Sequence, residues 1–456
     1  MYDIYVNDVV RLCGGEVLYG DERLKLSIFC TDTRKINKGD VYVGIVGERV
    51  DGNDFYKEAV EKGASCIILS KKPAEELENV TVIRVDDTLK CLQELAKYKR
   101  SLYDIPVIAV TGSVGKTSTK DIIYSVVSSK YKTHRTIGNY NNHLGVPLTL
   151  LGMSDDTEAL VVEMGMNHFG EISLLSKIAK PTIGVITNIG TAHIGNLGSR
   201  EGIRKAKLEI LDGMLGNDLI VNGDDDMLSG VLDELRLKYD VSSVSIDSES
   251  TYRAIDLEED VFSSKFDIEG NASEVQVNVG GKAYIYNSLV AYAVGKCLDI
   301  SDEDIKDGIR EFKLSSSRLE KKVTKKGVIL IDDTYNANYD SMKSSIELLG
   351  KVKDKRRIAI LGDMLELGDY SEEMHITLGD VVVNNSIDVL VTIGECSKLI
   401  KDRAISLGMN KDNVYSFDKE EDSYSFLDEL LGSEDVVLLK ASHGIHLIGI
   451  VDYLMK

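Results

Sequence analysis

A short run in the first third of the chain has the residue types needed to hold a phosphate group. In VIAVTGSVGKTSTKD, residues 107–121, an apolar stretch leads into a turn with Gly112 and Gly115, and we expect a helix to start at Lys116. Glycines let backbone N–H groups approach phosphate oxygens without interference from a Cβ atom, and a helix N-terminus attracts anions. Lys116 would add a positive charge beside the β- and γ-phosphates, and the Thr117 hydroxyl could bind Mg²⁺.

The loop is a variant of the usual phosphate-loop pattern. That pattern has a glycine five residues before Gly115, where this chain has Val110, so Thr111 and Gly112 would make the turn. A chance match in an ordinary turn is the alternative, and the strand–loop–helix context disfavours it. An N-K-x-D sequence at 37–40 resembles a guanine-recognising motif, but it precedes the loop, whereas a GTPase needs it afterwards. We interpret it as a turn.

Two strand-like stretches farther along end in side chains that could bind a metal ion. Glu163 closes the stretch ALVVE, and His193 lies in the loop after TIGVITNIG, residues 182–190. In an open parallel sheet, ligands bind at the carboxyl ends of the strands, and Mg²⁺ prefers oxygen ligands. Each residue by itself is more often structural, but their positions after successive strands favour a role at the phosphate site.

Other charged residues remain ambiguous from spacing alone. Lys205 and Lys207 lie on an expected helix, where lysines are usually solvated. The strand-like ILIDD ends in Asp332 and Asp333, which could hold a metal, a ribose or an amine. An aspartate or asparagine after a strand is also often a helix cap.

The apolar pattern divides the chain into three α/β parts. Residues 1–104 combine short strands with a closing helix at 88–104, which predicts a small mixed α/β domain. Residues 105–314 alternate strands and helices, which predicts a doubly wound parallel sheet around the phosphate loop. Residues 315–456 repeat strand–helix units and predict a Rossmann-like domain.

Within the central part, one stretch differs from its surroundings. The alternating residues of 251–285 predict a small antiparallel addition, followed by helices near 287–298 and 302–312. In the last part the expected strands are 327–333, 357–363, 388–394 and 435–440.

The composition excludes several classes of protein. The chain has 456 residues, 43% of them hydrophobic, and a net charge of −21 from 54 basic and 75 acidic residues. General binding to duplex nucleic acid needs a basic face, so we expect no nucleic-acid partner. The start MYDIYVNDVV lacks the apolar segment of a signal peptide, and no run of ~20 apolar residues predicts a membrane span. The six cysteines form no C-x-x-C pair, which favours reduced thiols and a cytoplasmic protein.

Several segments, taken together and in order, resemble the Mur ligases. The N-terminal stretch TDTRKINKGDVYVGIVGERVDGNDF (31–55) is similar to the uridine-binding domain of that family, and the resemblance extends from there to the C-terminus. The other matching segments are GSVGKTS (112–118), GNYNNHLGVPLTLL (138–151), VVEMGMNHFGEI (161–172), TNIGTAHIGNLGS (187–199), KAKLEIL (205–211), SSRLE (316–320), DDTYNAN (332–338) and LGDMLELG (361–368).

The resemblance implies a three-domain, ATP-dependent ligase of cell-wall precursor synthesis. The pattern is most similar to members that add D-Ala-D-Ala to UDP-MurNAc-tripeptide through an acyl phosphate, giving ADP and phosphate. The N-terminal domain would hold the UDP group and the central domain MgATP. The C-terminal domain would close over the site and help to bind ATP and the amine.

The resemblance also implies roles for individual residues. Lys116 would act on the phosphates, Thr117 and Glu163 would hold one Mg²⁺, and His193 would serve a second. Lys207 matches the family lysine that CO₂ converts to a carbamate, which would complete the metal site. Such a lysine must be neutral to react, so burial and nearby cations must lower its pKa. Glu171 matches a segment near the second metal.

Two binding sets follow from the same matches. The ATP-binding set is Thr111, Gly112, Ser113, Val114, Gly115, Lys116, Thr117, Ser118, Asn287, Arg318, Asp333 and Tyr335. The substrate-binding set is Thr31, Asp32, Thr33, Arg34, Gly52, Asn53, Asn141, Asn142, His168, Asn336 and Asn338.

The chain departs from the family pattern at several positions. Ala283 and Tyr284 replace a usual His and Asn, Tyr339 replaces Pro, His443 replaces Arg, and Asn53 stands where His is common. Two alternatives therefore accompany the cell-wall ligase: a Mur-like ligase of another pathway with a different amine or acid, and a nucleotide-binding regulator without ligase activity. We expect a monomer that binds small-molecule substrates.

Overall fold

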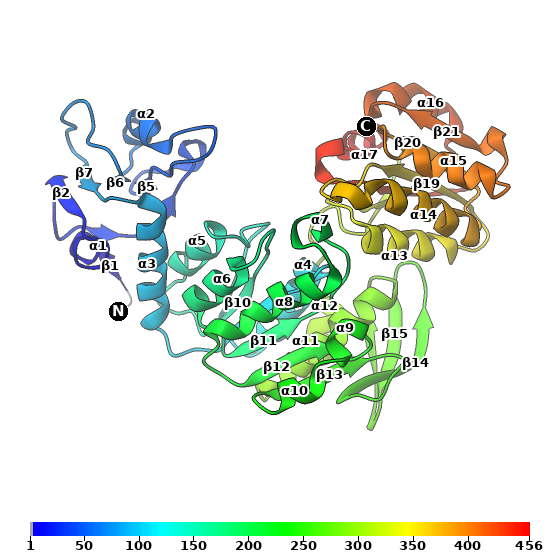
Figure 1. Ribbon diagram of the computed structural model, residues 1–456, viewed down its shortest axis with the longest axis horizontal. Coiled ribbons are helices and arrows are strands. Elements are labelled where there is room, and N and C mark those ends of the chain that lie inside the picture. Colours follow the sequence, from blue (N-terminus) through cyan, green and yellow to red (C-terminus); the bar gives the residue numbers. More distant parts are fainter. Residues whose placement is uncertain (1–2) are drawn as a thin grey trace.

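The chain has a three-domain α/β fold in which each domain is built around its own main sheet (Figure 1). The computed structural model describes residues 3–456, apart from the side chains of 271–273. The N-terminal and C-terminal domains lie at opposite ends of the molecule, with the central domain between them (Figure 1). In this arrangement the central domain adjoins both of the other domains.

The N-terminal domain contains a five-stranded sheet in the order β2-β7-β6-β5-β4. The last four of these strands are parallel, and β2 is antiparallel to β7. A separate pair, β1 and β3, is antiparallel. The bounds are β1 (Ile4–Tyr5), β2 (Glu16–Tyr19), β3 (Lys25–Leu26), β4 (Phe29–Cys30), β5 (Val41–Val43), β6 (Cys66–Leu69), β7 (Thr81–Arg84), α1 (Val6–Cys13), α2 (Tyr56–Glu61) and α3 (Thr88–Ser101).

Helix α3 joins the first domain to the second. It begins where the Asp87 side chain accepts a hydrogen bond from the Lys90 N–H, and it ends at Ser101, three residues before the expected end. Near its end, the buried Arg100 donates hydrogen bonds to the carbonyls of Tyr103, Ala179 and Lys180. These bonds fix the helix to the central domain.

The central domain has a nine-stranded sheet in the order β16-β15-β14-β13-β12-β11-β8-β10-β9. The seven strands from β14 to β9 are parallel, and β15 and β16 are antiparallel. The bounds are β8 (Val107–Thr111), β9 (Thr133–Arg135), β10 (Ala159–Glu163), β11 (Ile183–Ile186), β12 (Asp218–Asn222), β13 (Asp240–Ser245), β14 (Tyr252–Glu259), β15 (Ser264–Ile268) and β16 (Asn271–Val277).

Side chains of the central strand β8 alternate between two cores, as expected for a strand covered on both faces. Val107 and Ala109 join the core that includes α5, α6 and α8, whereas Ile108 and Val110 join the core that includes α4, α11 and α12. The helix bounds are α4 (Lys116–Val127), α5 (Gly145–Leu151), α6 (Glu171–Ala179), α7 (Ile194–Leu197), α8 (Arg200–Leu208), α9 (Asp226–Ser229), α10 (Leu232–Arg236), α11 (Lys282–Cys297) and α12 (Asp302–Glu311).

The antiparallel addition is shorter than expected. It ends at Val277, and α11 begins at Lys282, so the expected boundary at 285 and the helix start near 287 are wrong. Tyr284 and Ile285 are buried together with residues 287–295, so the buried part of α11 begins before the expected start near 287.

The C-terminal domain has a six-stranded sheet in the order β17-β18-β22-β19-β20-β21. Strand β17 is antiparallel and the other five are parallel. The bounds are β17 (Glu320–Val323), β18 (Ile329–Asp332), β19 (Arg356–Gly362), β20 (Val389–Ile393), β21 (Val414–Phe417), β22 (Asp435–Lys440), α13 (Tyr339–Gly350), α14 (Ser371–Asn384), α15 (Lys398–Ser406), α16 (Tyr424–Leu430) and α17 (Ile448–Met455).

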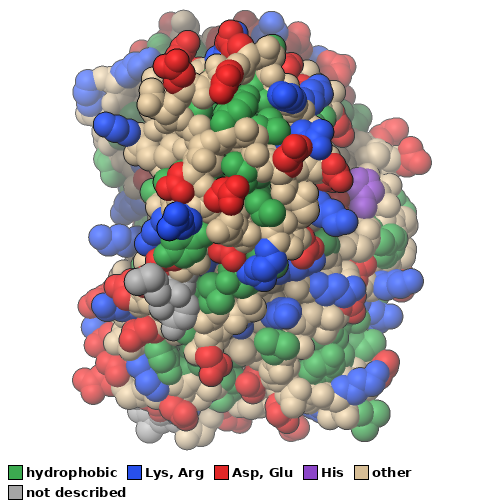
Figure 2. Space-filling model, turned by 90° about the vertical axis from the view of Figure 1, so that its left-hand side faces the viewer, with side chains coloured by type: hydrophobic (Ala, Val, Ile, Leu, Met, Phe, Trp, Pro, Cys, Tyr) green, Lys and Arg blue, Asp and Glu red, His purple; other side chains and the backbone are tan. Residues whose placement is uncertain are grey.

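The surface and the thiols agree with the composition. Acidic and basic side chains are interspersed over the face drawn in Figure 2. Within residues 3–456, no helix has the length and apolar character needed to cross a bilayer. All six cysteines are free thiols.

A buried histidine holds the loop that follows β19. His375 of α14 is inaccessible to solvent; its Nε2 accepts the Met364 N–H at 3.0 Å, and its Nδ1 donates to the Ser371 carbonyl at 2.7 Å. Burial lowers the pKa of His375 below 6.5, although the Ser371 carbonyl and Asp363 oppose the shift. The imidazole is therefore neutral in the folded domain at neutral pH.

We predict that this loop loosens in acid. The unfolded histidine takes up a proton near pH 6.5, before the folded one does, so the stabilising contribution is complete above that pH and is lost as the pH falls toward the lowered pKa. Hydrogen exchange of the Met364 amide, corrected for intrinsic rate, should lose protection over this range. In His375→Gln the corrected protection should not vary with pH there, and an unchanged wild-type amide would contradict the assignment.

Candidate active site

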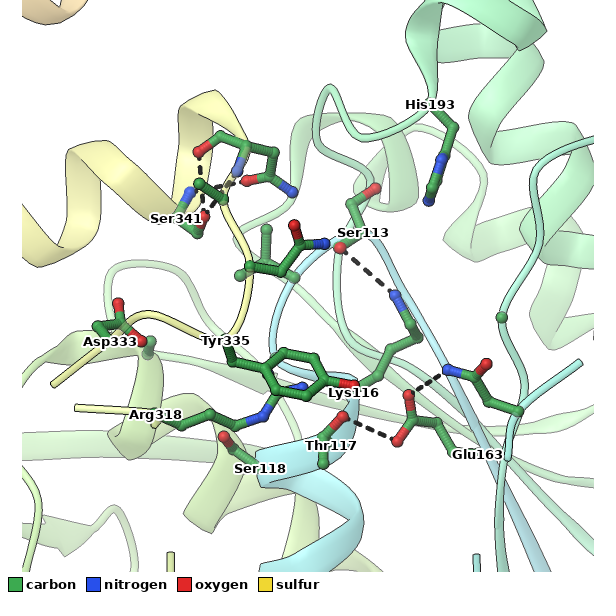
Figure 3. A pocket seen from close by; sticks show the side chains of 18 of the residues that line it. Ser113, Lys116, Thr117, Ser118, Glu163, His193, Arg318, Asp333, Tyr335 and Ser341 are labelled. Carbon is green, nitrogen blue, oxygen red and sulfur yellow. Dashed lines mark hydrogen bonds between the residues drawn. The ribbon is translucent and has the colours of Figure 1, made fainter. Parts of the chain in front are cut away.

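The phosphate loop connects β8 to α4 as the sequence predicts. Helix α4 starts at Lys116, and Gly115 precedes it with a φ of 84°. Gly112 has a φ of 152°, and a Cβ atom there would lie 1.9 Å from Thr187 Oγ1, so only glycine fits. Lys116 Nζ donates to the Gly112 carbonyl at 2.7 Å. It also lies 3.5 Å from the Ser113 carbonyl oxygen, so the lysine side chain folds across the loop (Figure 3).

The turn after β11 supports this loop from the side. Ser113 N donates to the Asn188 carbonyl at 3.1 Å, and Val114 N donates to Asn188 Oδ1 at 2.9 Å. The Thr187 hydroxyl and the Asn188 amide both donate to the Val114 carbonyl. With its backbone held in this way, the loop is shaped before any ligand arrives.

Oxygen ligands suited to Mg²⁺ meet beside the first turn of α4. Thr117 Oγ1 donates to Glu163 Oε2 at 2.9 Å, and Asn141 Nδ2 donates to Glu163 Oε1 at 2.8 Å (Figure 3). Glu163 is only 2% exposed. In the described part of the chain, no three His, Cys, Asp or Glu side chains form a cluster that could hold a metal. The hydroxyl and carboxylate nevertheless fit Mg²⁺, which binds through one or two carboxylates and keeps water or phosphate ligands.

Lys207 is buried, contrary to the expectation from helix position alone. Its side chain on α8 is 2% exposed, whereas Lys205 on the same helix is exposed and lies 5.8 Å from the Phe169 ring centroid. Burial, followed by repulsion from Lys116, lowers the pKa of Lys207 well below its usual 10.5. Burial likewise lowers the pKa of Lys116, with Glu163 opposing the shift.

His193 faces the same space from the loop before α7 (Figure 3). Its backbone has a positive φ of 63°, and its buried Nδ1 has no hydrogen-bond partner in the described structure. Glu366 Oε2 lies 3.4 Å from that nitrogen. Burial first, then Lys116 and Lys207, lower the pKa of His193 to about 4, so the ring is neutral at pH 7 and can donate a lone pair.

The opposite side of the cavity is built from both the central and the C-terminal domain. The Arg318 guanidinium lies 3.9 Å from the Tyr335 ring centroid, a cation–π contact beside the start of α4 (Figure 3). Arg318 Nε and Ser113 Oγ are buried polar atoms without a partner in the described residues. Burying such atoms is costly unless a ligand satisfies them.

Several polar side chains here already have structural partners. Asp333 Oδ2 accepts from Lys440 Nζ at 2.6 Å and from Ser345 Oγ at 2.7 Å. Asn287 Oδ1 accepts from Thr119 Oγ1 at 2.8 Å, and Asn338 caps α13 by accepting the Ser341 N–H. Asp332 is inaccessible and pairs with Lys322, so it faces away from any ligand.

One cavity of about 450 Å³ collects most of the predicted residues. Those that line it are Ser113, Val114, Gly115, Lys116, Thr117, Ser118, Asn141, Asn142, Glu163, Glu171, His193, Asn287, Arg318, Asp333, Tyr335, Asn336 and Asn338. Thr111, Gly112, Lys207 and His168 are not among its lining residues. The site residues predicted from the sequence did not include Lys440 and Glu366, which also line the cavity. Lys440 is the last residue of the expected strand 435–440, and Glu366 lies in the segment LGDMLELG (361–368), so these positions were the available signals.

The predicted residues of the N-terminal domain lie outside this cavity: Thr31, Asp32, Thr33, Arg34, Gly52 and Asn53 are absent from its lining. Arg34 forms two hydrogen bonds of 2.8 Å with Asp32, which lowers the pKa of Asp32 to about 2. Asn53 is buried and hydrogen-bonds to Asp51 and Ser70. The Asn53 side chain is therefore engaged in hydrogen bonds within the N-terminal domain.

The unusual aromatic residue of α11 occupies the core. Tyr284 is 4% exposed, and its hydroxyl lies 3.2 Å from Ser118 Oγ. Its ring packs against Phe312 with a centroid distance of 6.1 Å. Tyr284 therefore supports the first turn of α4, and both Tyr284 and Ala283 line the cavity.

Comparisons with known proteins identify similar chains over nearly the full length. Family models match for the Mur ligase family catalytic domain at 25–100, the Mur ligase middle domain at 110–295 and the Mur ligase glutamate ligase domain at 317–443. The UDP-N-acetylmuramoyl-tripeptide–D-alanyl-D-alanine ligase of Bacillus subtilis is 37% identical over 428 residues, which cover 93% of this chain and 92% of that protein.

Solved structures show the same similarity in three dimensions. MurF from Acinetobacter baumannii superposes with a TM-score of 0.90 at 29% identity and covers 99% of both chains. MurF ligase from Thermotoga maritima, in complex with ADP, has a TM-score of 0.81 at 28% identity, covering 94% of this chain and 97% of that one.

We predict that Lys207→Met stabilises the ligand-free protein. The lowered pKa means that the fold disfavours the charged amine, which is fully charged in the unfolded chain at pH 7, so folding carries a cost that the uncharged methionine avoids. The melting temperature should rise, whereas Lys205→Met on the exposed side of the same helix should change it little. A lower melting temperature for Lys207→Met alone would show that the amine has a stabilising partner.

Proposed function

The chain belongs to the Mur ligase family, and we propose that it joins D-Ala-D-Ala to UDP-MurNAc-tripeptide while converting ATP to ADP and phosphate. The observation that carries the proposal is the nearly full-length match to a ligase with this name. The cavity beside the phosphate loop contains the groups that the chemistry needs.

We propose a division of labour among the three parts of the chain. Residues 1–104 would hold the UDP end of the acid substrate, 105–314 would bind MgATP, and 315–456 would cover the nucleotide and receive the dipeptide. The ion pair between Asp32 and Arg34 would present a polar surface at the uridine end. The predicted UDP-binding and ATP-binding residues lie on separate domains. The UDP-linked substrate would therefore extend from the N-terminal domain to the central domain.

The reaction overcomes the poor reactivity of a carboxylate in two steps. A carboxylate oxygen of the tripeptide attacks the γ-phosphorus, and the bond between that phosphorus and ADP breaks. The amine nitrogen of D-Ala-D-Ala then attacks the acyl carbon, the bond to phosphate breaks, and the amine proton passes to solvent. Both steps concentrate negative charge on phosphoryl oxygens, so positioning and charge stabilisation are the main requirements.

The residues of the loop meet these requirements. Lys116, which folds onto the Gly112 carbonyl here, would turn its ammonium group toward the β- and γ-phosphates. Backbone N–H groups of the loop and the N-terminus of α4 would bind the same oxygens. When bound, Mg²⁺ neutralises phosphate charge and orients the γ-phosphate. Thr117 and Glu163 would hold one ion, with Asn141 orienting the carboxylate.

Lys207 and His193 would serve a second ion. A buried lysine with a lowered pKa contains the neutral amine that reacts with CO₂, and the resulting carbamate would supply an anionic oxygen ligand. The neutral His193 ring would present its unpaired Nδ1 to the same ion. The carbamate would also remove the repulsion between Lys207 and Lys116.

The remaining cavity residues would bind the rest of ATP and the amine. Arg318, Tyr335, Asp333 and Asn287 would bind the nucleotide, with Arg318 Nε free to receive an oxygen. Asn336, Asn338 and Asn142 would lie toward the dipeptide and the acyl group, and so would His168, which does not line the cavity. Because one chain contains every group in this scheme, we propose that a monomer in the cytoplasm is sufficient.

The test is phosphate release from MgATP with each substrate omitted in turn. We expect release only when UDP-MurNAc-tripeptide and D-Ala-D-Ala are both present, together with a UDP-linked product enlarged by the dipeptide mass. Turnover with a different amine alone would redirect the proposal to another pathway. ATP binding without turnover for any amine would favour a regulator.

We predict that Lys116→Ala abolishes ligation with little change in binding of the UDP substrate. Loss of a charge that acts mainly on the transition state should lower kcat by about 100-fold or more. Isothermal titration with UDP-MurNAc-tripeptide gives the second readout, and Lys343→Ala, an exposed lysine on α13, is the control. Equal loss of UDP-substrate binding would show that the domain assignment is wrong.

A further inference from the structure

One short segment of the central domain contacts three different parts of the site. We call residues 187–193, which follow β11, the platform. Its first two residues hold the phosphate loop, through the bonds of Thr187 and Asn188 to Val114. Its last residue, His193, faces the cavity. A contact to residues 189–192 is therefore connected, through the backbone, to both the phosphate loop and His193.

The middle of the platform is fixed from behind. Ile189 N donates to Asp225 Oδ2 at 2.7 Å, and the Ile189 carbonyl accepts from Arg200 Nη2 at 2.8 Å. Arg200 is in turn paired with Asp226. Because both backbone groups of Ile189 are bonded within the central domain, the middle of the platform is held in place.

The C-terminal domain contacts this platform at two carboxylates, Glu366 beside His193 and Asp340 beside Thr191. Asp340, in the first turn of α13, accepts from Thr191 N at 2.8 Å and from Thr191 Oγ1 at 2.9 Å, both on Oδ2. A Cβ atom at Gly190 would lie 2.3 Å from the same oxygen, so the approach requires glycine there. The N-terminus of α13 also favours the negative charge of Asp340.

A second contact lies on the other side of His193. The Tyr370 hydroxyl donates to the Gly198 carbonyl at 3.3 Å, and a Cβ atom on Gly195 would lie 3.3 Å from Gly368 N. Contacts on both sides of His193, together with the ion pair between Lys351 and Glu259, hold the C-terminal domain over the cavity. Of the contacts at Asp340 and Tyr370, the one at Asp340 is charged and has two donors, so it is the stronger.

We propose that Asp340 is a positioning residue that fastens the C-terminal domain to the platform, and through it to the phosphate loop. It acts by bringing Tyr335 and Arg318 against the nucleotide bound at the loop, and in this respect it rests on the proposed function. Asp340 does not line the cavity and touches no reacting atom. Removing the Asp340 side chain should hinder placement of the C-terminal domain against the phosphate loop. It should leave the chemical steps unchanged in molecules where that domain is in place.

Steady-state ligation gives the first test. Asp340→Ala should lower kcat/KM for ATP by about 10- to 100-fold, whereas Asp340→Asn should retain most of it because its amide oxygen accepts the same two bonds. Thr191→Val keeps its N–H donor and should lose less. Adding Thr191→Val to Asp340→Ala should cause no further loss. Glu372→Ala, which removes an exposed acid from the first turn of α14, is the control for helix charge.

The outcomes separate positioning from stability. Far-UV circular dichroism of Asp340→Ala and Asp340→Asn at the assay temperature should agree, so that a difference in kcat/KM reflects the lost acceptor in folded protein. Wild-type kinetics for Asp340→Ala, equal losses in Ala and Asn variants, or additive losses with Thr191→Val would each overturn the proposal.

Small-angle X-ray scattering tests the contact without ligation. With MgADP, Asp340→Ala should have a larger radius of gyration than the wild type or Asp340→Asn, because its C-terminal domain is released. Identical scattering would overturn the proposal. If the wild type shows no ligation with any amine, the proposed function fails, but the scattering comparison still decides the role of Asp340.

Discussion

Strands β8 and β11 run parallel and in register, with Thr111 opposite Ile186, so their carboxyl ends leave the sheet together. The turn after β8 and the turn after β11 therefore lie against each other. This contact places Thr187 where it excludes a Cβ from Gly112 and shapes the phosphate loop. It also places His193 over the loop and offers Thr191 to the C-terminal domain. The location of the site follows from this one strand pairing.

Electrostatics explains why the cavity is suited to an anionic ligand. Lys116, Lys207 and His193 interact electrostatically, and burial lowers the pKa of all three, although Lys207 does not line the cavity. In a chain with a net charge of −21, these are groups that can become cationic beside an anion, although His193 is neutral at pH 7. Phosphates and a lysine carbamate would relieve the repulsion, so ligand binding and charge balance support each other.

The sequence predicted the main architecture because periodicity and strand-end chemistry are local properties. The phosphate loop, Glu163 and His193 could be placed at neighbouring strand ends from their order alone. The start of α11 could not, because α11 is buried on most of its sides and its sequence lacks the one-sided apolar pattern that marks a surface helix. The burial of Lys207 could not be deduced from helix position either, since it depends on how α8 packs against the sheet. The pairings of Asp333 with Lys440 and of Asp340 with Thr191 join residues more than 100 positions apart, which no local pattern reveals.

The bare backbone at Gly190 has a consequence for how related sequences can diverge. A side chain at position 190 fits only if the side chain at 340 is shorter or points elsewhere. A carboxylate at 340 can reach Thr191 only if position 190 is glycine. The two positions are 150 residues apart but share one small volume. Drift at one should therefore be accompanied by change at the other, and covariation between them would be the evolutionary record of domain docking.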